Sequence, residues 1–257
     1  MKIVLLAGGF GTRISEETSS IPKPMVTIGN KPILAHLMEC YSAHGFNNFI
    51  VACGYKGEEI KKYFANFFLS NSDWSISLQT GEVQVVGSST PDWQVRVVDT
   101  GLNTLTGGRL LRLKEHIGKE RFMLTYGDGL ANVDITKLLR FHVAHGKYAT
   151  VTGVRPPARF GELILNGSKV TGFSEKPQSS VGRINGGFFV FEPEIFDYLS
   201  GDDTTLERDP LEQLASDGQL EAFSHDGFWQ PMDTLRDRKY LEELHALGSV
   251  PWLASSV

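Results

Sequence analysis

The chain has 257 residues, 41% hydrophobic and 21% charged, which suits one large α/β domain or one domain with an appendage. Its net charge of −5, from 25 basic and 30 acidic residues, argues against a nucleic-acid or anionic-membrane binder. Cys40 and Cys53 lack metal-site spacing and are expected to be buried thiols. The start lacks a signal peptide and no apolar run approaches a membrane span, so we expect a cytoplasmic protein.

The first motif predicts a phosphate-binding loop. An apolar run over residues 3–7 leads into Gly8-Gly9-Phe10-Gly11-Thr12-Arg13, and Lys23 follows between two prolines. A buried strand that opens into glycines exposes backbone N–H groups, which can cradle phosphate oxygens. Arg13 adds a planar guanidinium with several donors, and Lys23 adds a compact ammonium charge. A turn that uses glycine only for geometry is the alternative, and the two cations favour phosphate binding.

The next segments alternate between helices and strands. Periodicity predicts a helix over 33–43, a strand over 49–53 and a helix over 56–68, with short links typical of βαβ units and a largely parallel sheet. Residues 70–105 interrupt this order with three strand-like pieces, and we predict an irregular β-rich insertion. We hypothesise that part of it packs against another subunit and positions residues 104–109.

The second half contains a candidate ligand site at a strand end. After a helix predicted over 109–116, strand 122–126 stops at Gly127-Asp128-Gly129, and carboxylates at the end of a parallel strand lie where open α/β sheets bind ligands. A helix over 134–144, a strand over 149–153 and a hairpin over 162–174 follow. Glycines in strand 183–191 indicate backbone close to a ligand. A helix over 210–217, a strand over 221–224 and a helix over 234–247 complete one domain, residues 1–257.

The motifs together resemble the sugar-1-phosphate nucleotidylyltransferases over nearly the whole chain. The resemblance rests on Leu6–Arg13 with Pro22-Lys23-Pro24, Gly127-Asp128-Gly129, Glu175-Lys176-Pro177 and Asn185-Gly186-Gly187. It implies a Rossmann-like α/β fold, with a mixed, mainly parallel sheet flanked by helices, of the nucleotide-diphospho-sugar transferase type. It also implies that residues 160–190 bind the sugar phosphate.

Four further segments resemble the cytidylyl-transferring members of that family. They are Val98–Gly101, Thr106–Arg109, Thr125–Gly129 and Phe228–Arg236. The resemblance implies that CTP and glucose 1-phosphate react to give CDP-glucose and pyrophosphate, a first step toward CDP-linked 3,6-dideoxyhexoses of surface polysaccharide such as lipopolysaccharide O-antigen. It also implies a homo-oligomer, such as a hexamer.

The resemblance assigns site residues in four groups. The catalytic residues are Arg13, Lys23 and Asp128, and one Mg²⁺ is held by Asp128 and Asp233. Residues that bind CTP are Leu6, Ala7, Gly8, Gly9, Phe10, Gly11, Thr12, Arg13, Lys23, Thr104, Arg109 and Gly127. Residues that bind the sugar phosphate are Glu175, Lys176 and Asn185. Gly129, where related enzymes carry Asn or Val, receives no role.

The implied chemistry needs no general base. A phosphate monoester has a second pKa of about 6 and is largely dianionic at neutral pH. The chain accordingly offers no convincing catalytic histidine. An oxygen of the sugar phosphate attacks the α-phosphorus of CTP in line. Lys23 would lie at the α-phosphate and Arg13 at the departing pyrophosphate. Asp233 could instead be the N-cap of the last helix, a role that Thr234 could fill equally well.

Arg109 is the candidate for base choice. Cytosine presents N3 and O2 as acceptors, uracil and thymine carry a hydrogen on N3, and arginine can only donate. With uracil or thymine, the hydrogen on N3 would face the donors of Arg109, and these unpaired donors would cost roughly 1–3 kcal/mol. Thr104 and the Gly107-Gly108 backbone would complete the pocket. The alternative is that Arg109 only begins a surface helix.

Three other functions are the alternatives to this interpretation. A thymidylyl-, uridylyl- or guanylyltransferase would share the motifs, and a silent regulatory relative usually lacks a cation or carboxylate that is present here. A dinucleotide oxidoreductase is disfavoured because Gly8–Gly11 lacks the G-x-G-x-x-G spacing.

Overall fold

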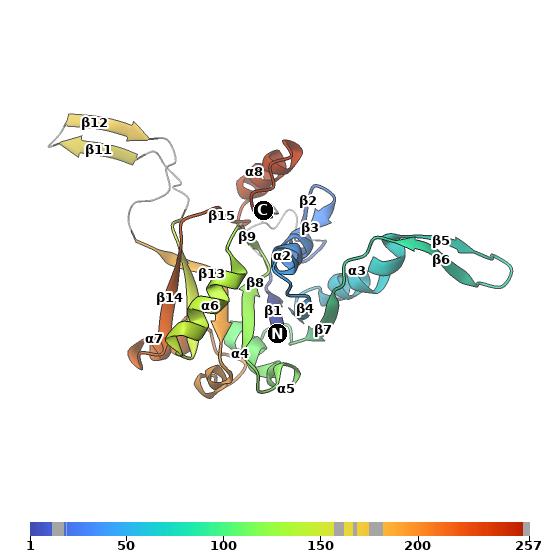
Figure 1. Ribbon diagram of the computed structural model, residues 1–257, viewed down its shortest axis with the longest axis horizontal. Coiled ribbons are helices and arrows are strands. Elements are labelled where there is room, and N and C mark those ends of the chain that lie inside the picture. Colours follow the sequence, from blue (N-terminus) through green and yellow to red (C-terminus); the bar gives the residue numbers. More distant parts are fainter. Residues whose placement is uncertain (12–17, 19, 157–161, 167–168, 175–181, 254–257) are drawn as a thin grey trace.

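The structure is a computed structural model that describes residues 1–11, 18, 20–156, 162–166, 169–174 and 182–253. Its centre is a seven-stranded sheet in the order β14-β10-β13-β8-β1-β4-β7 (Figure 1). The strands are β1 (Lys2–Ala7), β4 (Asn48–Cys53), β7 (Gln94–Asp99), β8 (Phe122–Tyr126), β10 (Ala149–Val154), β13 (Ile184–Phe191) and β14 (Leu220–His225). Every neighbouring pair is parallel except those of β13, which runs against both β8 and β10. The predicted mixed, mainly parallel sheet is confirmed.

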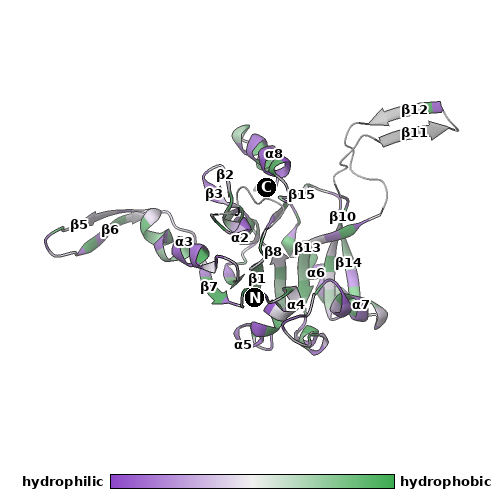
Figure 2. Ribbon diagram, turned by 180° about the vertical axis from the view of Figure 1, so that it is seen from behind, coloured by the Kyte–Doolittle hydropathy of each residue, from purple (hydrophilic) through white to green (hydrophobic). Residues whose placement is uncertain are grey.

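Helices cover both faces of the sheet because its central strands are apolar on both sides. In β1, Ile3 and Leu5 belong to one core cluster, whereas Val4 and Leu6 belong to the other (Figure 2). The first cluster is covered by α2 (Ile33–Ser42), α3 (Gly57–Ser70), α6 (Ile135–His145) and α8 (Leu235–Ala246). The second is covered by α4 (Thr106–Arg112), α5 (Lys114–Ile117), the 3₁₀ helix η3 (Pro193–Tyr198) and α7 (Asp209–Ser216).

Short elements complete the described part of the chain. The 3₁₀ helix η2 (Lys23–Met25) precedes β2 (Thr27–Ile28) and β3 (Lys31–Pro32), which pair with each other. The hairpin of β11 (Glu162–Asn166) and β12 (Lys169–Ser174) confirms the prediction for that segment. Strands β9 (Gly129–Ala131) and β15 (Trp229–Pro231), which were not predicted, pair antiparallel and join two distant parts of the chain.

The prediction for residues 70–105 is only partly right. Strands β5 (Ser72–Ile76) and β6 (Val83–Ser88) form a hairpin that projects from the end of α3 (Figure 1). Strand β7, by contrast, belongs to the central sheet and runs parallel to β4. The reason is its alternating pattern, since Val95 and Val97 pack on one core and Val98 on the other.

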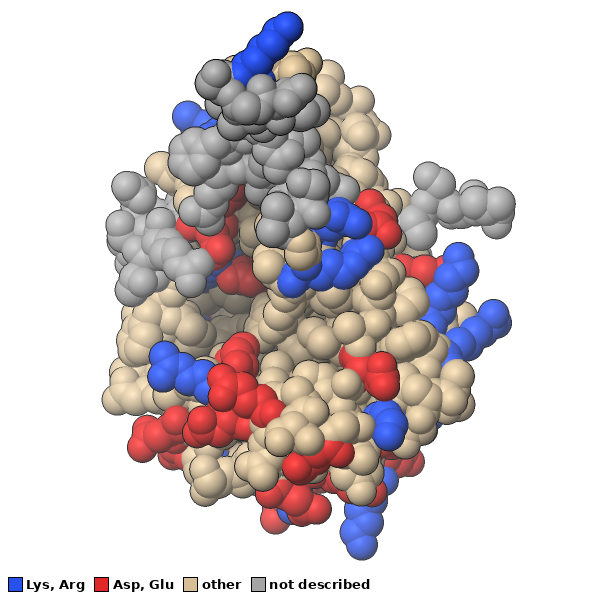
Figure 3. Space-filling view, turned by 90° about the vertical axis from the view of Figure 1, so that its left-hand side faces the viewer, with Lys and Arg blue, Asp and Glu red and all other residues tan. Residues whose placement is uncertain are grey.

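On the face seen in Figure 3, acidic side chains are most numerous in the lower half, and basic and acidic side chains lie beside one another above it. Among the described residues, no helix is long and apolar enough to cross a bilayer.

Arg109 ties the ends of three sheet strands together. Its two terminal nitrogens donate to oxygens that follow or end these strands: Nη1 to Cys53 O (3.1 Å), Thr100 Oγ1 (2.8 Å) and Gly101 O (2.6 Å), and Nη2 to Gly8 O (2.9 Å) and Leu102 O (3.2 Å). The residue is only 4% exposed, so the alternative of a surface helix start is wrong. The helix begins earlier, at Thr106, and ends at Arg112.

Two glycines make room for this guanidinium. A Cβ on Gly8 would lie 2.3 Å from Arg109 Cζ, and one on Gly54 would lie 2.4 Å from Nη1. A methyl group at either position would push the guanidinium away from the carbonyls that it holds.

We therefore expect Gly8→Ala to destabilise the protein by about 1–3 kcal/mol, the cost of leaving buried carbonyls unpaired. Gly9→Ala is the matched control, because a Cβ there would meet nothing within 4 Å. Urea unfolding of both variants measures the difference. Equal stability of the two variants would contradict the role of Arg109 as a clamp.

Candidate active site

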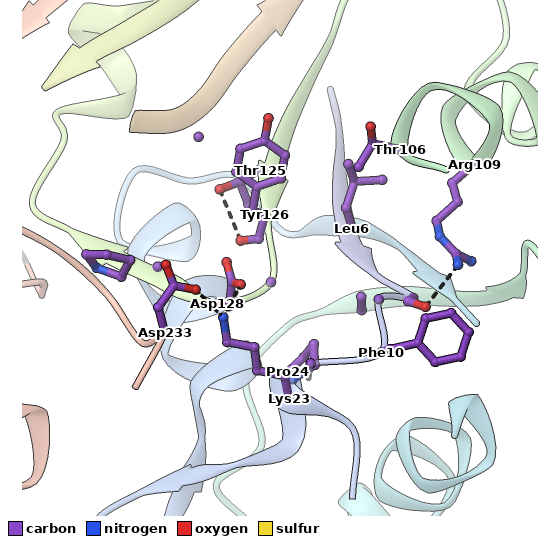
Figure 4. A pocket seen from close by; sticks show the side chains of 18 of the residues that line it. Leu6, Phe10, Lys23, Pro24, Thr106, Arg109, Thr125, Tyr126, Asp128 and Asp233 are labelled. Atoms are coloured by element: carbon purple, nitrogen blue, oxygen red, sulfur yellow. Dashed lines mark hydrogen bonds and ion pairs between the residues drawn. The ribbon is translucent and has the colours of Figure 1, made fainter. Parts of the chain in front are cut away.

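A cavity of about 540 Å³ opens where the strand ends meet. The ends of β1 and β8 and the loop after β7 contribute Gly8, Gly127 and Thr104 to its lining. Strand β13 runs in the opposite direction, so its beginning, at Asn185, reaches the same edge. The cavity thus occupies the position where open α/β sheets bind ligands (Figure 4).

The glycine loop forms one wall of the cavity. Leu6 to Gly11 line it without interruption. Gly11 has φ +64, and a Cβ there would lie 2.9 Å from Thr18 Cγ2, so the loop requires glycine at this position. Thr12 and Arg13 lie outside the described residues, and their roles remain predictions.

Lys23 contacts two carboxylates from distant parts of the chain. Its Nζ lies 2.7 Å from Asp128 Oδ2 and 2.7 Å from Asp233 Oδ1 (Figure 4). Burial opposes the charged form of this lysine, but the ionic contacts with Asp128 and Asp233 outweigh it and raise the pKa of Lys23. Three of the predicted site residues are therefore brought into direct contact.

Pairing of β9 with β15 brings the two aspartates together. Asp128 immediately precedes β9, Asp233 follows β15, and Met232 N donates to Asp128 O at 2.8 Å. Asp233 is not the N-cap of α8. Thr234 caps this helix in a capping box with Asp237, which leaves the Asp233 carboxylate directed at Lys23.

The two carboxylates suit a divalent cation. They already converge on one cation, the Lys23 ammonium, which stands where a metal ion would be shared. The described residues contain no group of three or more His, Cys, Asp or Glu side chains that could hold a metal. A Mg²⁺ ion held by one or two carboxylates commonly takes its remaining ligands from phosphate oxygens and water.

The loop over 102–106, for which we predicted contact with the nucleoside, forms another wall of the cavity. Thr104 is 7% exposed and lines the cavity, as Arg109 does. The expectation that the Gly107-Gly108 backbone completes this pocket is wrong. Residues 202–204 cover these glycines, and a Cβ on Gly108 would lie 2.4 Å from Asp202 O.

The opposite side carries a fixed amide. Asn185 Oδ1 accepts from Gly187 N at 2.8 Å, and its Nδ2 donates to Tyr126 Oη at 3.2 Å. Gly187 has φ +81, and a Cβ there would lie 2.5 Å from the Tyr126 ring. Trp229 Nε1 donates to Gly186 O at 2.8 Å. Glu175 and Lys176 lie outside the described residues.

Tyr126, Trp229 and Glu207 were not predicted as site residues. Tyr126 ends a predicted strand beside Asp128, and Trp229 belongs to the Phe228–Arg236 motif, so a signal existed for both. Glu207 accepts a hydrogen bond from Tyr126 Oη at 2.6 Å, but nothing around it in the sequence indicated this.

Relatives of known activity match the chain almost from end to end. It is 52% identical to the glucose-1-phosphate cytidylyltransferase of Salmonella typhimurium over 253 residues, 98% of each chain. It is 46% identical to a probable glucose-1-phosphate cytidylyltransferase of Bacillus subtilis, over 98% of this chain and 99% of that one. A mannose-1-phosphate guanyltransferase of Neurospora crassa is 31% identical over 97% of this chain and 66% of its own length.

Solved structures confirm the fold. HddC from Yersinia pseudotuberculosis has a TM-score of 0.70 at 23% identity, covering 95% of this chain and 99% of its own. A UDP-glucose pyrophosphorylase in complex with UDP-glucose has a TM-score of 0.69 at 18% identity, covering 96% and 98%. The Nucleotidyl transferase family matches residues 2–234. With its sequence, fold and site in agreement, the chain belongs to the nucleotidyl transferase family.

Proposed function

We propose that this protein transfers the cytidylyl group of CTP to glucose 1-phosphate, giving CDP-glucose and pyrophosphate. The observation that carries the proposal is the lysine held between two carboxylates beside a glycine loop, in a chain 52% identical to a glucose-1-phosphate cytidylyltransferase. The relatives supply the choice of substrates, and the geometry supplies a site for joining two phosphates.

The reaction demands charge neutralisation more than proton transfer. An oxygen of the sugar phosphate attacks the α-phosphorus of CTP in line, the bond to the β-phosphate breaks, and pyrophosphate leaves. Both reactants are polyanions, so the site must hold them close together and stabilise charge moving onto the leaving group. We assign this task to the backbone N–H groups of Gly8 to Gly11 and to the Lys23 ammonium, because all of these residues line the cavity. Arg13, beyond the described residues, would take the leaving end.

A Mg²⁺ ion fits the role of counter-ion to the aspartates. Held by Asp128 and Asp233, it would supply a Lewis acid to the phosphate oxygens. The Lys23 ammonium, which contacts both carboxylates, is our assignment for the α-phosphate. The side chains of the chain itself orient the phosphates and neutralise their charge.

We assign the sugar phosphate to the side of the cavity that contains Asn185. Its amide is oriented by Tyr126 and Gly187, so it presents a fixed pattern to sugar hydroxyls. Glu175 and Lys176 remain our predictions for the sugar and its phosphate.

We assign base choice to Arg109 and Thr104. Both line the cavity, and a guanidinium can only donate. The terminal nitrogens of Arg109 hold backbone carbonyls, so direct contact with O2 or N3 of cytosine requires one of these bonds to be exchanged. The longest of them is the 3.2 Å bond to Leu102 O.

A second copy of this chain is our proposal for the partner of the β5–β6 hairpin. Leu78 and Val86 are 91% and 77% exposed, and Trp74 is 45% exposed. An isolated two-stranded hairpin is at best marginally stable in water, and such apolar exposure marks an interaction surface. We therefore propose a homo-oligomer, for which a hexamer is one possible size.

The first test is pyrophosphate release from glucose 1-phosphate with CTP, UTP, dTTP and GTP. We expect CTP to be used in strong preference, and Arg109→Ala to lower kcat/KM for CTP about tenfold to a hundredfold more than for UTP. Preference for GTP or dTTP would contradict the proposed function. Equal losses with CTP and UTP would leave Arg109 as a clamp only.

The second test is metal dependence. Chelation with EDTA should stop pyrophosphate release, and Mg²⁺ should restore it. In Asp233→Asn we expect the Mg²⁺ concentration for half-maximal rate to rise at least about tenfold, because one of two protein ligands loses its charge. Asp73→Asn, an exposed aspartate of β5, is the control. An unchanged Mg²⁺ requirement in Asp233→Asn would rule out this site.

The third test is the mass of the protein in solution. Light scattering should give a multiple of the chain mass for the wild-type protein. Replacement of Leu78 and Val86 by Ser should lower it, because both side chains lose apolar contact area. Ala at Ser75 and Thr80, polar positions of the same hairpin, should leave the mass unchanged. A wild-type mass of one chain would refute this proposal.

A further inference from the structure

Glu207 receives hydrogen bonds from two sides of the cavity. Its Oε2 accepts from Thr106 Oγ1 at 2.6 Å, and its Oε1 accepts from Tyr126 Oη at 2.6 Å. Thr106 and Tyr126 belong to the described lining of the cavity, whereas Glu207 does not. Figure 4 shows the two hydroxyls directed to the same side, where a single carboxylate can hold both.

The contact with Thr106 belongs to the nucleoside side. Thr106 is the first residue of α4 and follows directly on the loop that contains Thr104. Its Oγ1 also accepts from Leu206 N at 2.9 Å, and Thr204 O accepts from Gly107 N at 2.9 Å. The segment that ends at Glu207 therefore fixes the first turn of α4.

The contact with Tyr126 belongs to the sugar side. Asn185 Nδ2 donates to Tyr126 Oη, which in turn donates to Glu207, so the hydrogen bonds run in one direction from amide to phenol to carboxylate. Burial raises the pKa of Tyr126, and the charge of Glu207 adds to this effect, so the phenol remains a donor. The orientation of the Asn185 amide thus depends on a carboxylate outside the cavity.

We propose that Glu207 is a positioning residue that aligns the nucleoside and sugar sides of the site through Thr106 and Tyr126. The inference rests on the proposed function for the identity of the two substrates. Glu207 touches neither of them. Because each carboxylate oxygen holds one side, loss of Glu207 should weaken the binding of both substrates.

A purely structural role predicts a different pattern. If Glu207 only stabilised the fold, its removal would lower the melting temperature and leave the KM values of the folded enzyme unchanged. If it positioned one side alone, only one KM would rise. The test therefore needs both KM values and a separate variant for each arm.

The experiment compares five variants by pyrophosphate release, with KM measured for CTP and for glucose 1-phosphate. Thr106→Val should raise mainly the KM for CTP, and Tyr126→Phe mainly the KM for glucose 1-phosphate. Glu207→Ala should raise both about tenfold, the factor for one charge-assisted hydrogen bond on each side. Glu207→Gln keeps the size and one acceptor oxygen, so it should give smaller increases. Glu212→Gln, an exposed residue of α7, is the matched control.

Non-additivity gives the decisive signature. In the Glu207→Ala background, Thr106→Val and Tyr126→Phe should each raise KM by less than a further factor of about two. The reason is that Glu207, which accepts hydrogen bonds from both hydroxyls, has already been removed. Full additivity, or an unchanged KM for either substrate in Glu207→Ala, would overturn the inference. Should Glu207→Ala fail to fold, the same double variants in Glu207→Gln serve instead. A wild-type protein that releases no pyrophosphate from CTP and glucose 1-phosphate would overturn the proposed function, which is a separate result.

Discussion

The site depends on one arrangement, a cation held between two carboxylates at the edge of the sheet. Asp128 and Asp233 each direct a carboxylate oxygen at the same point, and a positive charge there offsets their mutual repulsion. Lys23 supplies that charge at 2.7 Å from each. The pairing of β9 with β15 and the cap at Thr234 serve to bring the second aspartate to the first. These two aspartates are also the residues that would hold Mg²⁺ in the proposed function.

Around this centre, loops from several strand ends must keep a fixed spacing. Parallel strands bring their carboxyl ends to one edge, but the loops that follow are held by few contacts of their own. Arg109 provides such contacts by donating hydrogen bonds to carbonyl oxygens at or just after the ends of β1, β4 and β7. A guanidinium suits this task because it offers several donors in a rigid plane. Its burial between Gly8 and Gly54 leaves little freedom to move.

The reversed strand β13 explains how its first residues reach the same edge as the ends of the parallel strands. Because it runs against its neighbours, its first residues lie beside the last residues of β8. Asn185 is thereby placed next to Tyr126, and Glu207 connects this pair to the first turn of α4. The two halves of the cavity are thus linked by side chains from segments distant in sequence.

The sequence by itself determined the class of fold and predicted a phosphate site. Apolar runs, glycines and strand-end carboxylates are local signals, so β1, β4, β8 and the importance of Lys23 and Asp128 could be predicted. Only the tertiary structure decided that β7 joins the central sheet, that Arg109 holds carbonyls, and that Glu207 accepts a hydrogen bond from Tyr126. Each of these depends on contacts between residues far apart in the chain, which no local pattern of residue types encodes. Asp233 lies between the two cases. Its motif was visible in the sequence, but only the structure showed that Thr234, and not Asp233, caps α8.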